Sequence, residues 1–479
     1  MQTEKRTITP RSEDFSQWYL DVIDAAELAE HAPVKGCMVI RPTGYAIWEQ
    51  VQKQLDTAFK EVDVENAYFP LLIPQSMLTR EAHHVEGFSP ELAVVTHAGG
   101  KELEEPLVIR PTSETVIQEM FKRWIQSYND LPLIVNQWAN VVRWEMRTRL
   151  FLRTTEFLWQ EGHTCHETQE EADARARQML EIYKHFAEHY MAIPVHDGEK
   201  SESEKFAGAD RTYTIEAMMQ DGKSLQFATS HNLGQNFAKA FDVEYLDRNN
   251  TLQNVWQTSW GLSTRSIGGL IMVHSDDAGL VLPPRIAPVQ VVILVVPPKE
   301  PADMATLTDQ ANSLAAELKS AGIRVKVDAS NERFGQKIFY WEKRGVPVRI
   351  EMGQRELAEG NLTVARRDTS EKQPVALKDV VGMLPEHLET IQEALFAKAL
   401  SFRAENTVIA STWEEFTAGI EAGKFVQAHW DGTVETEAKI KAETTATIRC
   451  RPFALAQESG VCVVTGKPSS GQVLFAKSY

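Results

Sequence analysis

The sequence predicts a multidomain α/β protein, and three observations lead to that prediction. Strand-like and helix-like segments alternate between residues 289 and 352, as in a compact domain built on a parallel or mixed sheet. Arginines alternate with apolar and aromatic residues between 141 and 157, which favours an antiparallel hairpin. Prolines at 283, 284 and 288 separate these regions. Because 479 residues suffice for several cores, we expect domains at 1–288, 289–400 and 401–479.

Local patterns specify the elements of each domain. In the first, helices are expected over 44–62, 115–128 and 167–189, among strands that pair as antiparallel hairpins. In the second, strands are expected over 289–296, 323–328 and 346–352, and helices over 305–321 and 335–344. The third is expected to be a smaller α+β unit ending in a strand over 472–476, with a core of Ile440, Ile448, Phe453, Val463, Val464, Leu474 and Phe475.

Composition indicates a globular, cytoplasmic protein without a membrane segment. Hydrophobic residues make up 43% of the chain and charged residues 24%, which is ordinary for a globular protein. The longest aliphatic run, Val291 to Val296, is far shorter than the roughly 20 residues that span a bilayer. No apolar segment follows the N-terminus, so we expect no secretory signal. Four scattered cysteines are too few for a disulfide framework.

The charge distribution is uneven. A net charge of −17 argues against indiscriminate nucleic-acid binding. Residues 333–367 nevertheless contain eight lysines and arginines against four glutamates, a local excess of +4. A polyanion could therefore bind to the second domain.

Arg143, Glu145 and Arg153 form the most informative motif. Every second side chain of a strand points to the same face, so Arg143 and Glu145 are expected to share a face, and Arg153 to return on the partner strand. Converging guanidinium groups suit a polyphosphate and its metal ion, because planar forks bind phosphate oxygens in pairs. A surface hairpin with salt bridges is the alternative interpretation.

Arg265 lies in a second distinctive segment, bounded by Gly261 and Gly268. Gly269 and Gly279 follow, around the aliphatic run 267–273. This pattern is consistent with a buried strand that enters a helix. Small residues would also let a purine nucleotide lie flat against the backbone.

The segment Arg110-Pro-Thr-Ser-Glu114 precedes a predicted helix. Thr112 or Ser113 is a typical N-cap there, and Glu114 is favoured near the positive end of the helix dipole. The same geometry can also receive a small cationic group, such as the ammonium of an amino acid. Taken singly, the segments around Trp159 and His163, Phe206, and Thr229 and His231 show no distinctive pattern.

Together these segments closely resemble the class II prolyl-tRNA synthetases, of the archaeal/eukaryotic-like type without an inserted editing domain. The resemblance covers essentially the whole chain. The first class II motif would end in Tyr68–Pro74, the second runs from Arg143 to Phe157, and the third contains Arg265. Arg110–Glu114, Phe206-Ala-Gly and Thr229–His231 are more specific to the proline family.

The resemblance implies a fold and an activity. The fold is a class II antiparallel-sheet catalytic core, an α/β anticodon-binding domain and a small α+β C-terminal domain. The activity is that of a proline–tRNA ligase: L-proline and ATP give prolyl-adenylate, and the prolyl group passes to the 3′ end of tRNA(Pro). The family also implies a homodimer, and Mg²⁺ that arrives with ATP.

Residue roles carried over from the family fall into two sets. Catalysis would involve Arg143, Glu145 and Arg265, and the ATP site would consist of Arg143, Glu145, Arg153, Phe157, Gln226, Thr229 and Arg265. Adenine would stack between Phe157 and Arg265. The proline site would consist of Phe88, Thr112, Glu114, Arg143, Trp159, His163, Phe206 and His231.

The second and third domains carry further expectations. Glu342, Arg349 and Arg355 would read the anticodon's guanines, which offer acceptors to arginine and donors to a carboxylate; a charge pair at a helix end is the alternative. Relatives often hold zinc through four cysteines, but the equivalent positions here are Asp431, Thr436, Cys462 and Thr465. Threonine does not replace a thiolate ligand, so we expect no zinc and no other bound metal site.

Two competing functions are less favoured by the sequence. A paralogue that loads a carrier protein would have little use for the basic second domain. A catalytically dead regulatory paralogue would have no reason to keep Arg143, Arg153 and Arg265 together.

Overall fold

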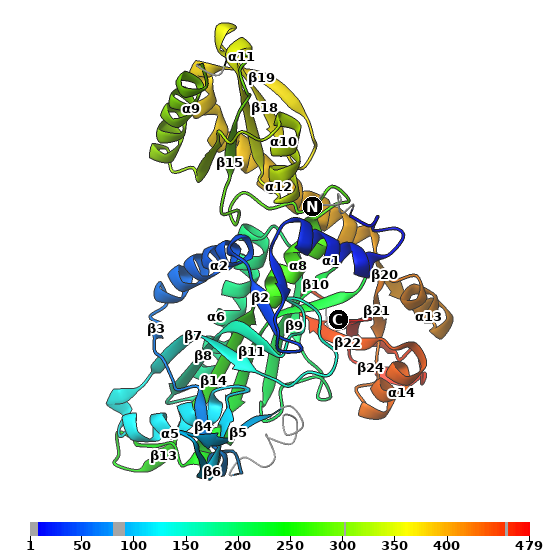
Figure 1. Ribbon diagram of the computed structural model, residues 1–479. Coiled ribbons are helices and arrows are strands. Elements are labelled where there is room, and N and C mark those ends of the chain that lie inside the picture. Colours follow the sequence, from blue (N-terminus) through cyan, green and yellow to red (C-terminus); the bar gives the residue numbers. More distant parts are fainter. Residues whose placement is uncertain (1–7, 80–91, 301–302, 456–457) are drawn as a thin grey trace.

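The computed structural model describes residues 8–79, 92–300, 303–455 and 458–479. Its largest element is an eleven-stranded sheet that runs through the lower part of the molecule in Figure 1. In spatial order its strands are β20 (Thr407–Ala410), β21 (Phe425–His429), β25 (Gln472–Ala476), β22 (Thr447–Pro452), β9 (Val195–Glu199), β10 (Arg211–Met218), β11 (Ser224–Gly234), β14 (Trp256–Ser263), β8 (Glu156–His166), β7 (Leu133–Val142) and β3 (Glu65–Asn66). All neighbours are antiparallel except β20–β21 and β3–β7.

One face of this sheet is covered by helices. Helix α6 (Gln169–His185) packs against β11 and β14, and its residues Met179 and Tyr183 are buried. The sequence specifies its start, because the Thr168 side chain accepts the Glu171 amide hydrogen and Glu170 lies in the first turn. A π-helical turn, Phe186–Tyr190, follows. The remaining helices around this core are α1 (Phe15–Ala25), α2 (Pro42–Lys60) and α8 (Arg265–His274).

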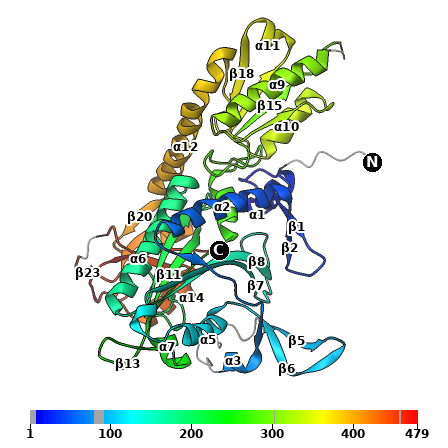
Figure 2. The same ribbon diagram turned by 90° about the vertical axis from the view of Figure 1, so that its left-hand side faces the viewer.

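A second sheet of five strands forms the upper unit in Figure 1. Its order is β16 (Val325–Asp328), β15 (Val291–Val295), β17 (Val348–Met352), β18 (Asn361–Arg366) and β19 (Lys372–Ala376). Strand β15 is parallel to both neighbours, and the other pairs are antiparallel. The helices of this unit are α9 (Asp303–Ser320), α10 (Phe334–Lys343) and α11 (Gln354–Ala358). Figure 2 shows the long α12 (Val380–Glu405) descending from it towards β20.

Smaller elements complete the structure. A three-stranded sheet, β4 (Leu72–Pro74), β6 (Lys101–Ile109) and β5 (Ala93–Ala98), lies at the lower end of Figure 1 beside α5 (Glu114–Trp124). The others are β1 (Ala29–His31), β2 (Met38–Ile40), α3 (Gln75–Thr79), α7 (Asn236–Phe241), β12 (Glu244–Leu246), β13 (Leu252–Asn254), α13 (Trp413–Glu421), α14 (Val434–Thr444), β23 (Gly460–Val461) and β24 (Pro468–Ser469). No helix in the described ranges is both long and apolar enough to cross a bilayer.

Two local predictions from the sequence were wrong. Phe453 was expected in the C-terminal core but is 41% exposed, with its ring centroid 5.9 Å from that of Tyr213. The arginines of the second motif were expected on strands, but β7 ends at Val142 and β8 begins at Glu156, so they lie in the connecting loop. Strand pairing stops there because the charged side chains turn towards a cavity and solvent.

The C-terminal unit, which contains β20–β25, is joined to the N-terminal unit, which contains β9–β11, in two ways. The two units share the eleven-stranded sheet, and a buried charge cluster connects them. Strand β22 pairs with β9. Beside this contact, the Glu216 carboxylate accepts hydrogen bonds from Lys200 Nζ (2.8 Å), Arg449 Nε (3.1 Å) and Ser224 Oγ (2.8 Å). Glu216 is completely buried; burial alone raises the pKa of its carboxyl, but Arg449 and Lys200 outweigh burial and lower the pKa to about 2.

We expect Glu216→Gln to lower the free energy of unfolding by about 3–5 kcal/mol, because two buried cations lose their counter-charge. The folded-state pKa lies below the unfolded value, so this stabilisation is present above about pH 4 and is lost as pH falls towards pH 2. Urea unfolding of the wild type and the variant, measured at pH 7 and near pH 2, tests this. Glu119→Gln, which breaks an exposed pair with Arg123, is the control and should cost only about 0.2–1 kcal/mol. Equal effects of the two substitutions would contradict the expectation.

Candidate active site

A cavity of about 260 Å³ lies on the sheet face opposite α6. Strand β8 shows why. The Gln160 side chain forms a hydrogen bond with Tyr183 of α6, whereas the alternate residues of the strand line the cavity. These are Phe157, Trp159, Glu161 and His163. The cavity also takes in Thr112, Glu114, Arg143, Phe206, Gln226, Thr229, His231 and Arg265, so it gathers most of the predicted site residues.

One end of the cavity is cationic. Arg265 is the first residue of α8 and donates from Nε to the Leu152 carbonyl oxygen at 3.1 Å. Arg143 donates from Nε to the Pro111 carbonyl oxygen at 3.0 Å, and its guanidinium carbon lies 5.4 Å from the Phe157 ring centroid. Burial, followed by the charges of Arg143 and Arg153, lowers the pKa of Arg265 to about 10. Clustered, partly buried cations are stabilised when an anion such as a phosphate approaches.

The other end of the cavity carries a pair of carboxyl groups and an imidazole. Ligand atoms of Glu114, Glu161 and His163 all lie within 4.8 Å of one another. Glu161 is 2% exposed and lies 3.1 Å from His163 Nε2. Burial raises the pKa of Glu161 and lowers that of His163, but their mutual attraction outweighs burial, so the pKa of Glu161 is lowered and that of His163 is raised. The two groups are therefore held as an ion pair.

This cluster suits an organic cation better than a metal ion. Glu161 already accepts hydrogen bonds from Ser113 Oγ and from Gln137 Nε2 at 2.6 Å, and Glu114 accepts from Thr112 Oγ1. These oxygens are committed to donors, whereas a metal ion needs several free ligand atoms in close coordination.

Two buried donors in the cavity have no partner among the described residues: His163 Nδ1 and Trp159 Nε1. A buried polar group without a partner is costly, so such groups mark places where a ligand or water binds.

Glu161 was not predicted from the sequence, although a signal existed. Phe157, Trp159, Glu161 and His163 stand at alternate positions of one strand and must share a face. The expectation that Ser113 caps a helix was only partly right. Ser113 occupies the N-cap position of α5, but its hydroxyl makes no capping bond and donates to Glu161 instead.

His231 occupies the cavity wall as a neutral ring. Its nitrogens lie 2.9 Å from Thr212 Oγ1 and 3.1 Å from Thr229 Oγ1, and its ring centroid is 4.8 Å from that of Phe206. Burial, and then the charge of His163, lowers its pKa to about 3. Its hydrogen bonds thus support the wall on the β10–β11 side.

Some predicted residues lie outside the cavity lining. Arg153 is half-exposed and donates from Nε to Glu145 at 2.6 Å, so these two form a pair in the loop beside the cavity. Phe88 lies outside the described residues. Among the glycines of the third motif, Gly261 lines the cavity, but a Cβ at Gly268 would lie 2.5 Å from Leu152, so that glycine serves helix packing.

A second cavity, of about 210 Å³, lies in the upper unit. Glu342 and Arg349 both line it, together with Trp341, Arg367 and Lys372. Arg355, also predicted to read bases, is exposed on α11 and pairs with Glu356 at 3.0 Å. Two of the three predicted residues are therefore brought together.

Comparison with known proteins identifies the family of this chain. Family models match residues 95–274 (tRNA synthetase class II core domain (G, H, P, S and T)), 290–387 (anticodon binding domain) and 413–479 (prolyl-tRNA synthetase, C-terminal). The proline–tRNA ligases of Chlorobium luteolum and Chlorobium chlorochromatii are 57% and 58% identical to the chain, over 98% of it and 99% of theirs. That of Porphyromonas gingivalis is 55% identical over the full length of both. The chain belongs to the class II prolyl-tRNA synthetases. The resemblance to class II prolyl-tRNA synthetases and the fold class predicted from the sequence are confirmed.

In this prolyl-tRNA synthetase, Asp431, Thr436 and Thr465, three of the positions that the resemblance equates with zinc ligands, belong to a hydrogen-bonded cluster. The Asp431 carboxylate accepts from Thr433 Oγ1 (2.8 Å), Thr436 Oγ1 (2.9 Å) and Thr465 Oγ1 (2.9 Å), and Cys462 is buried. The set of Asp431, Thr436, Cys462 and Thr465 offers one carboxylate, one thiol and two hydroxyl groups, which is not a donor set that holds structural zinc. Asp431 thus joins the start of α14 to the segment around Thr465 through hydrogen bonds.

We expect purified protein to contain no stoichiometric zinc, and a chelator to leave its melting temperature unchanged. Asp431→Ala should destabilise the C-terminal unit by about 2 kcal/mol, because three hydroxyl groups lose a charged acceptor. Elemental analysis and thermal denaturation measure these effects. Glu443→Ala removes an exposed 3.9 Å pair with Lys439 on α14 and should have little effect. One zinc per chain, or a fall in melting temperature with chelator, would refute the expectation.

Proposed function

We propose that this chain is a proline–tRNA ligase that activates L-proline with ATP and transfers it to the 3′ end of tRNA(Pro). The proposal rests on the separation of positive and negative side chains in the catalytic cavity. Arg143 and Arg265 lie at one end, Glu114 and Glu161 at the other, and aromatic rings form walls between them. A zwitterionic amino acid with a flat apolar ring matches all three features.

In the first step, the proline carboxylate attacks the α-phosphorus of ATP, and pyrophosphate leaves. Charge builds up on phosphate oxygens, so catalysis consists mainly of positioning and electrostatic stabilisation. Arg143 holds the α-phosphate and the proline carboxylate. Arg265, and Arg153 from the loop beside the cavity, bind the outer phosphates, with Mg²⁺ brought by the nucleotide.

The nucleotide base and the remaining ATP contacts complete this step. Adenine stacks between Phe157 and the guanidinium of Arg265. Gln226 and Thr229 of β11 face the nucleotide, and Glu145 keeps Arg153 in place through their ion pair.

The proline side of the cavity orients the nucleophile. Thr112 and Glu114 receive the secondary ammonium, and Trp159 and Phe206 enclose the ring, with His231 behind Phe206. The Glu161–His163 ion pair fixes the His163 ring at the cavity wall, so that its unpartnered Nδ1 faces the substrate side.

The second step and the selection of tRNA involve the other units. The 3′-terminal ribose of tRNA(Pro) attacks the adenylate, and AMP leaves. The cavity around Glu342 and Arg349 binds anticodon guanine, and exposed Arg355 contacts the same RNA. We propose domains at 1–288, 289–400 and 401–479 and a cytoplasmic location. We also propose a homodimer, for which exposed apolar side chains of the first motif and α5 are available: Tyr68, Leu72 and Trp124.

We further propose that the chain is of the archaeal/eukaryotic-like type without an editing domain. The 89 residues between β8 and β14, 167–255, form α6, β9–β11, α7, β12 and β13. Strands β9–β11 belong to the catalytic sheet, and α6 and α7 pack on its strands. The segment therefore leaves no room for a separate hydrolytic domain.

Proline-dependent ATP–pyrophosphate exchange tests the activity. Arg143→Ala should lower exchange about 100- to 1000-fold, because one donor to the developing charge is lost. Glu161→Gln should raise the KM for proline about tenfold and leave the KM for ATP unchanged, because the buried His163 loses its counter-charge. Lys122→Ala, which breaks an exposed pair with Asp242, is the control. Exchange that is independent of proline, or unaffected by Arg143→Ala, would overturn the proposal.

The cavity should also activate alanine at a measurable rate. Excluding a smaller apolar substrate is limited to roughly 1–3 kcal/mol per missing methylene. Without an editing domain, alanyl-tRNA made by the chain should persist. A deacylation assay with the pure protein measures this, and robust hydrolysis of alanyl-tRNA would contradict the expectation.

A further inference from the structure

The catalytic and anticodon-binding units touch directly, backbone against backbone. The segment after α8 donates from the Leu280 amide to the Lys343 carbonyl oxygen (3.1 Å) and from the Leu282 amide to the Gly345 carbonyl oxygen (3.3 Å). Gly279 has φ +136°, and a Cβ there would lie 2.8 Å from Lys343 Cα. The end of α10, which carries Glu342, is therefore fixed against the segment that follows α8.

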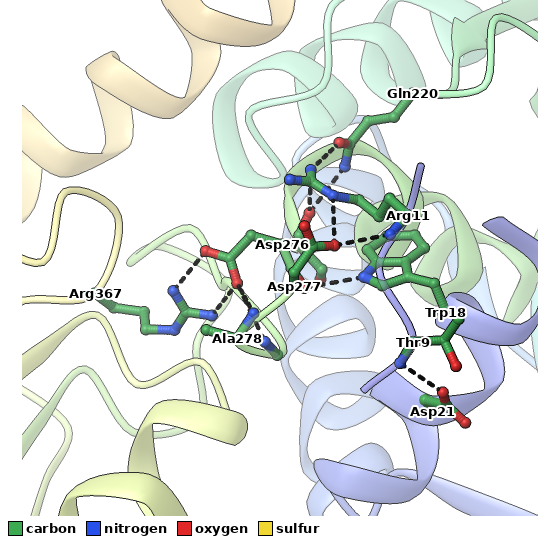
Figure 3. Close-up of polar contacts among 11 residues, drawn as sticks. Thr9, Arg11, Trp18, Asp21, Gln220, Asp276, Asp277, Ala278 and Arg367 are labelled. Atoms are coloured by element: carbon green, nitrogen blue, oxygen red, sulfur yellow. Dashed lines mark hydrogen bonds and ion pairs between the residues drawn. The ribbon is translucent and has the colours of Figure 1, made fainter. Parts of the chain in front are cut away.

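A partly buried ion pair crosses the same junction (Figure 3). Arg367, 7% exposed, donates from Nη1 and Nη2 to the two Asp276 carboxylate oxygens at 2.8 and 2.6 Å, a two-pronged contact. Its Nε donates to the Glu342 backbone carbonyl at 3.0 Å. One guanidinium thus joins the catalytic unit to the residue predicted to read the anticodon. Arg367 also lines the cavity around Glu342, but three of its donors are engaged and its charge is matched by Asp276.

Asp276 is held equally firmly on the catalytic side. Its Oδ1 accepts from the amides of Ala278 (2.9 Å) and Gly279 (3.1 Å), and its carbonyl oxygen accepts from Trp18 Nε1 (3.0 Å). The neighbouring Asp277 faces a different partner, Arg11, at 3.0 Å. The carboxylate of Asp276 therefore has a fixed position relative to α1 and to the end of α8.

Helix α8 links this junction to the catalytic cavity. Arg265 is its first residue and His274 its last, only two residues before Asp276. Ten helical residues span about 15 Å, and most of this helix is buried, so it cannot bend or shift without disturbing the core. Helix α8 is thus the rigid element that fixes the position of Arg265 relative to the second cavity, which Glu342 lines.

We propose that Asp276 and Arg367 are positioning residues for tRNA selection. Their ion pair holds the Glu342 end of α10 at the distance from the catalytic cavity at which anticodon and 3′ end of one tRNA bind together. This inference rests on the proposed proline–tRNA ligase function. It assigns no contact with proline, ATP or RNA to either side chain.

Asp276→Asn tests the proposal in the full-length protein. Asparagine keeps the acceptor for the amides of Ala278 and Gly279 but removes the charge that holds Arg367. The KM for tRNA in aminoacylation should rise about 5- to 100-fold, with proline-dependent ATP–pyrophosphate exchange unchanged. The backbone bonds at Leu280 and Leu282 remain, and so does the pair of Arg344 with Glu27, so the variant should fold. Asp277→Asn is the matched control and should leave the KM for tRNA unchanged.

A second readout separates positioning from a general loss of stability. With a tRNA altered at an anticodon guanine, the wild type should show strong discrimination, and Asp276→Asn should show less. Arg367→Lys should resemble Asp276→Asn, and the double variant should be no worse than either single one, because both break the same contact.

Three outcomes would overturn the inference. One is an unchanged KM for tRNA in Asp276→Asn together with normal exchange. Another is an effect of Arg367→Lys alone, which would mean that Arg367 binds RNA directly. A wild type without proline-dependent exchange would overturn the proposed function as well, so the two failures are distinguishable.

Discussion

Charged side chains in the candidate active-site cavity need oppositely charged or hydrogen-bonding partners. The positions of those partners determine which ligands can bind. At the cationic end, Arg265 is partly buried beside Arg143, and the loss of water contacts, followed by repulsion from Arg143, lowers the pKa of Arg265. At the other end, Glu161 and His163 neutralise each other, whereas Glu114 has Thr112 as its hydrogen-bond donor. A ligand with an anionic and a cationic end relieves both imbalances, in one orientation only. The charges of the cavity therefore favour one orientation of the substrate.

The eleven-stranded sheet makes this arrangement possible. Antiparallel strands present alternate side chains to opposite faces, so β8 supplies aromatic and charged groups to the cavity and Gln160 to the contact with α6. The same sheet extends through β9 and β22 into the C-terminal unit, where Lys200 and Arg449 meet Glu216. Displacement of the C-terminal unit would therefore disturb β10, whose Thr212 contacts His231. The C-terminal unit, although distant in sequence, therefore helps to keep the cavity walls in position.

Sequence patterns predicted the second unit well because aliphatic strands and amphipathic helices are local signals. Strand 346–352 was observed as Val348–Met352, and helix 305–321 as Asp303–Ser320. Glu161 was not predicted, because its role depends on hydrogen bonds with Ser113, Gln137 and His163. Ser113 and Gln137 come from other elements, so a local pattern does not reveal these contacts. Phe453 was expected in the core because it is apolar, yet it lies in a turn after β22 and is 41% exposed. Such outcomes depend on tertiary contacts that periodicity does not contain.

The two junctions between units differ in kind, and this difference matters for function. The C-terminal unit shares a sheet with the catalytic unit, so its position is fixed by strand pairing and by buried charge. In the described part of the chain, the five-stranded sheet shares no strand with the larger one. Its position depends on the contacts near Asp276, on the pair of Arg344 with Glu27 and on α12. Because interfaces of this kind are where relative domain motion is expected, a two-pronged ion pair at that junction has more influence on geometry than one placed inside either unit.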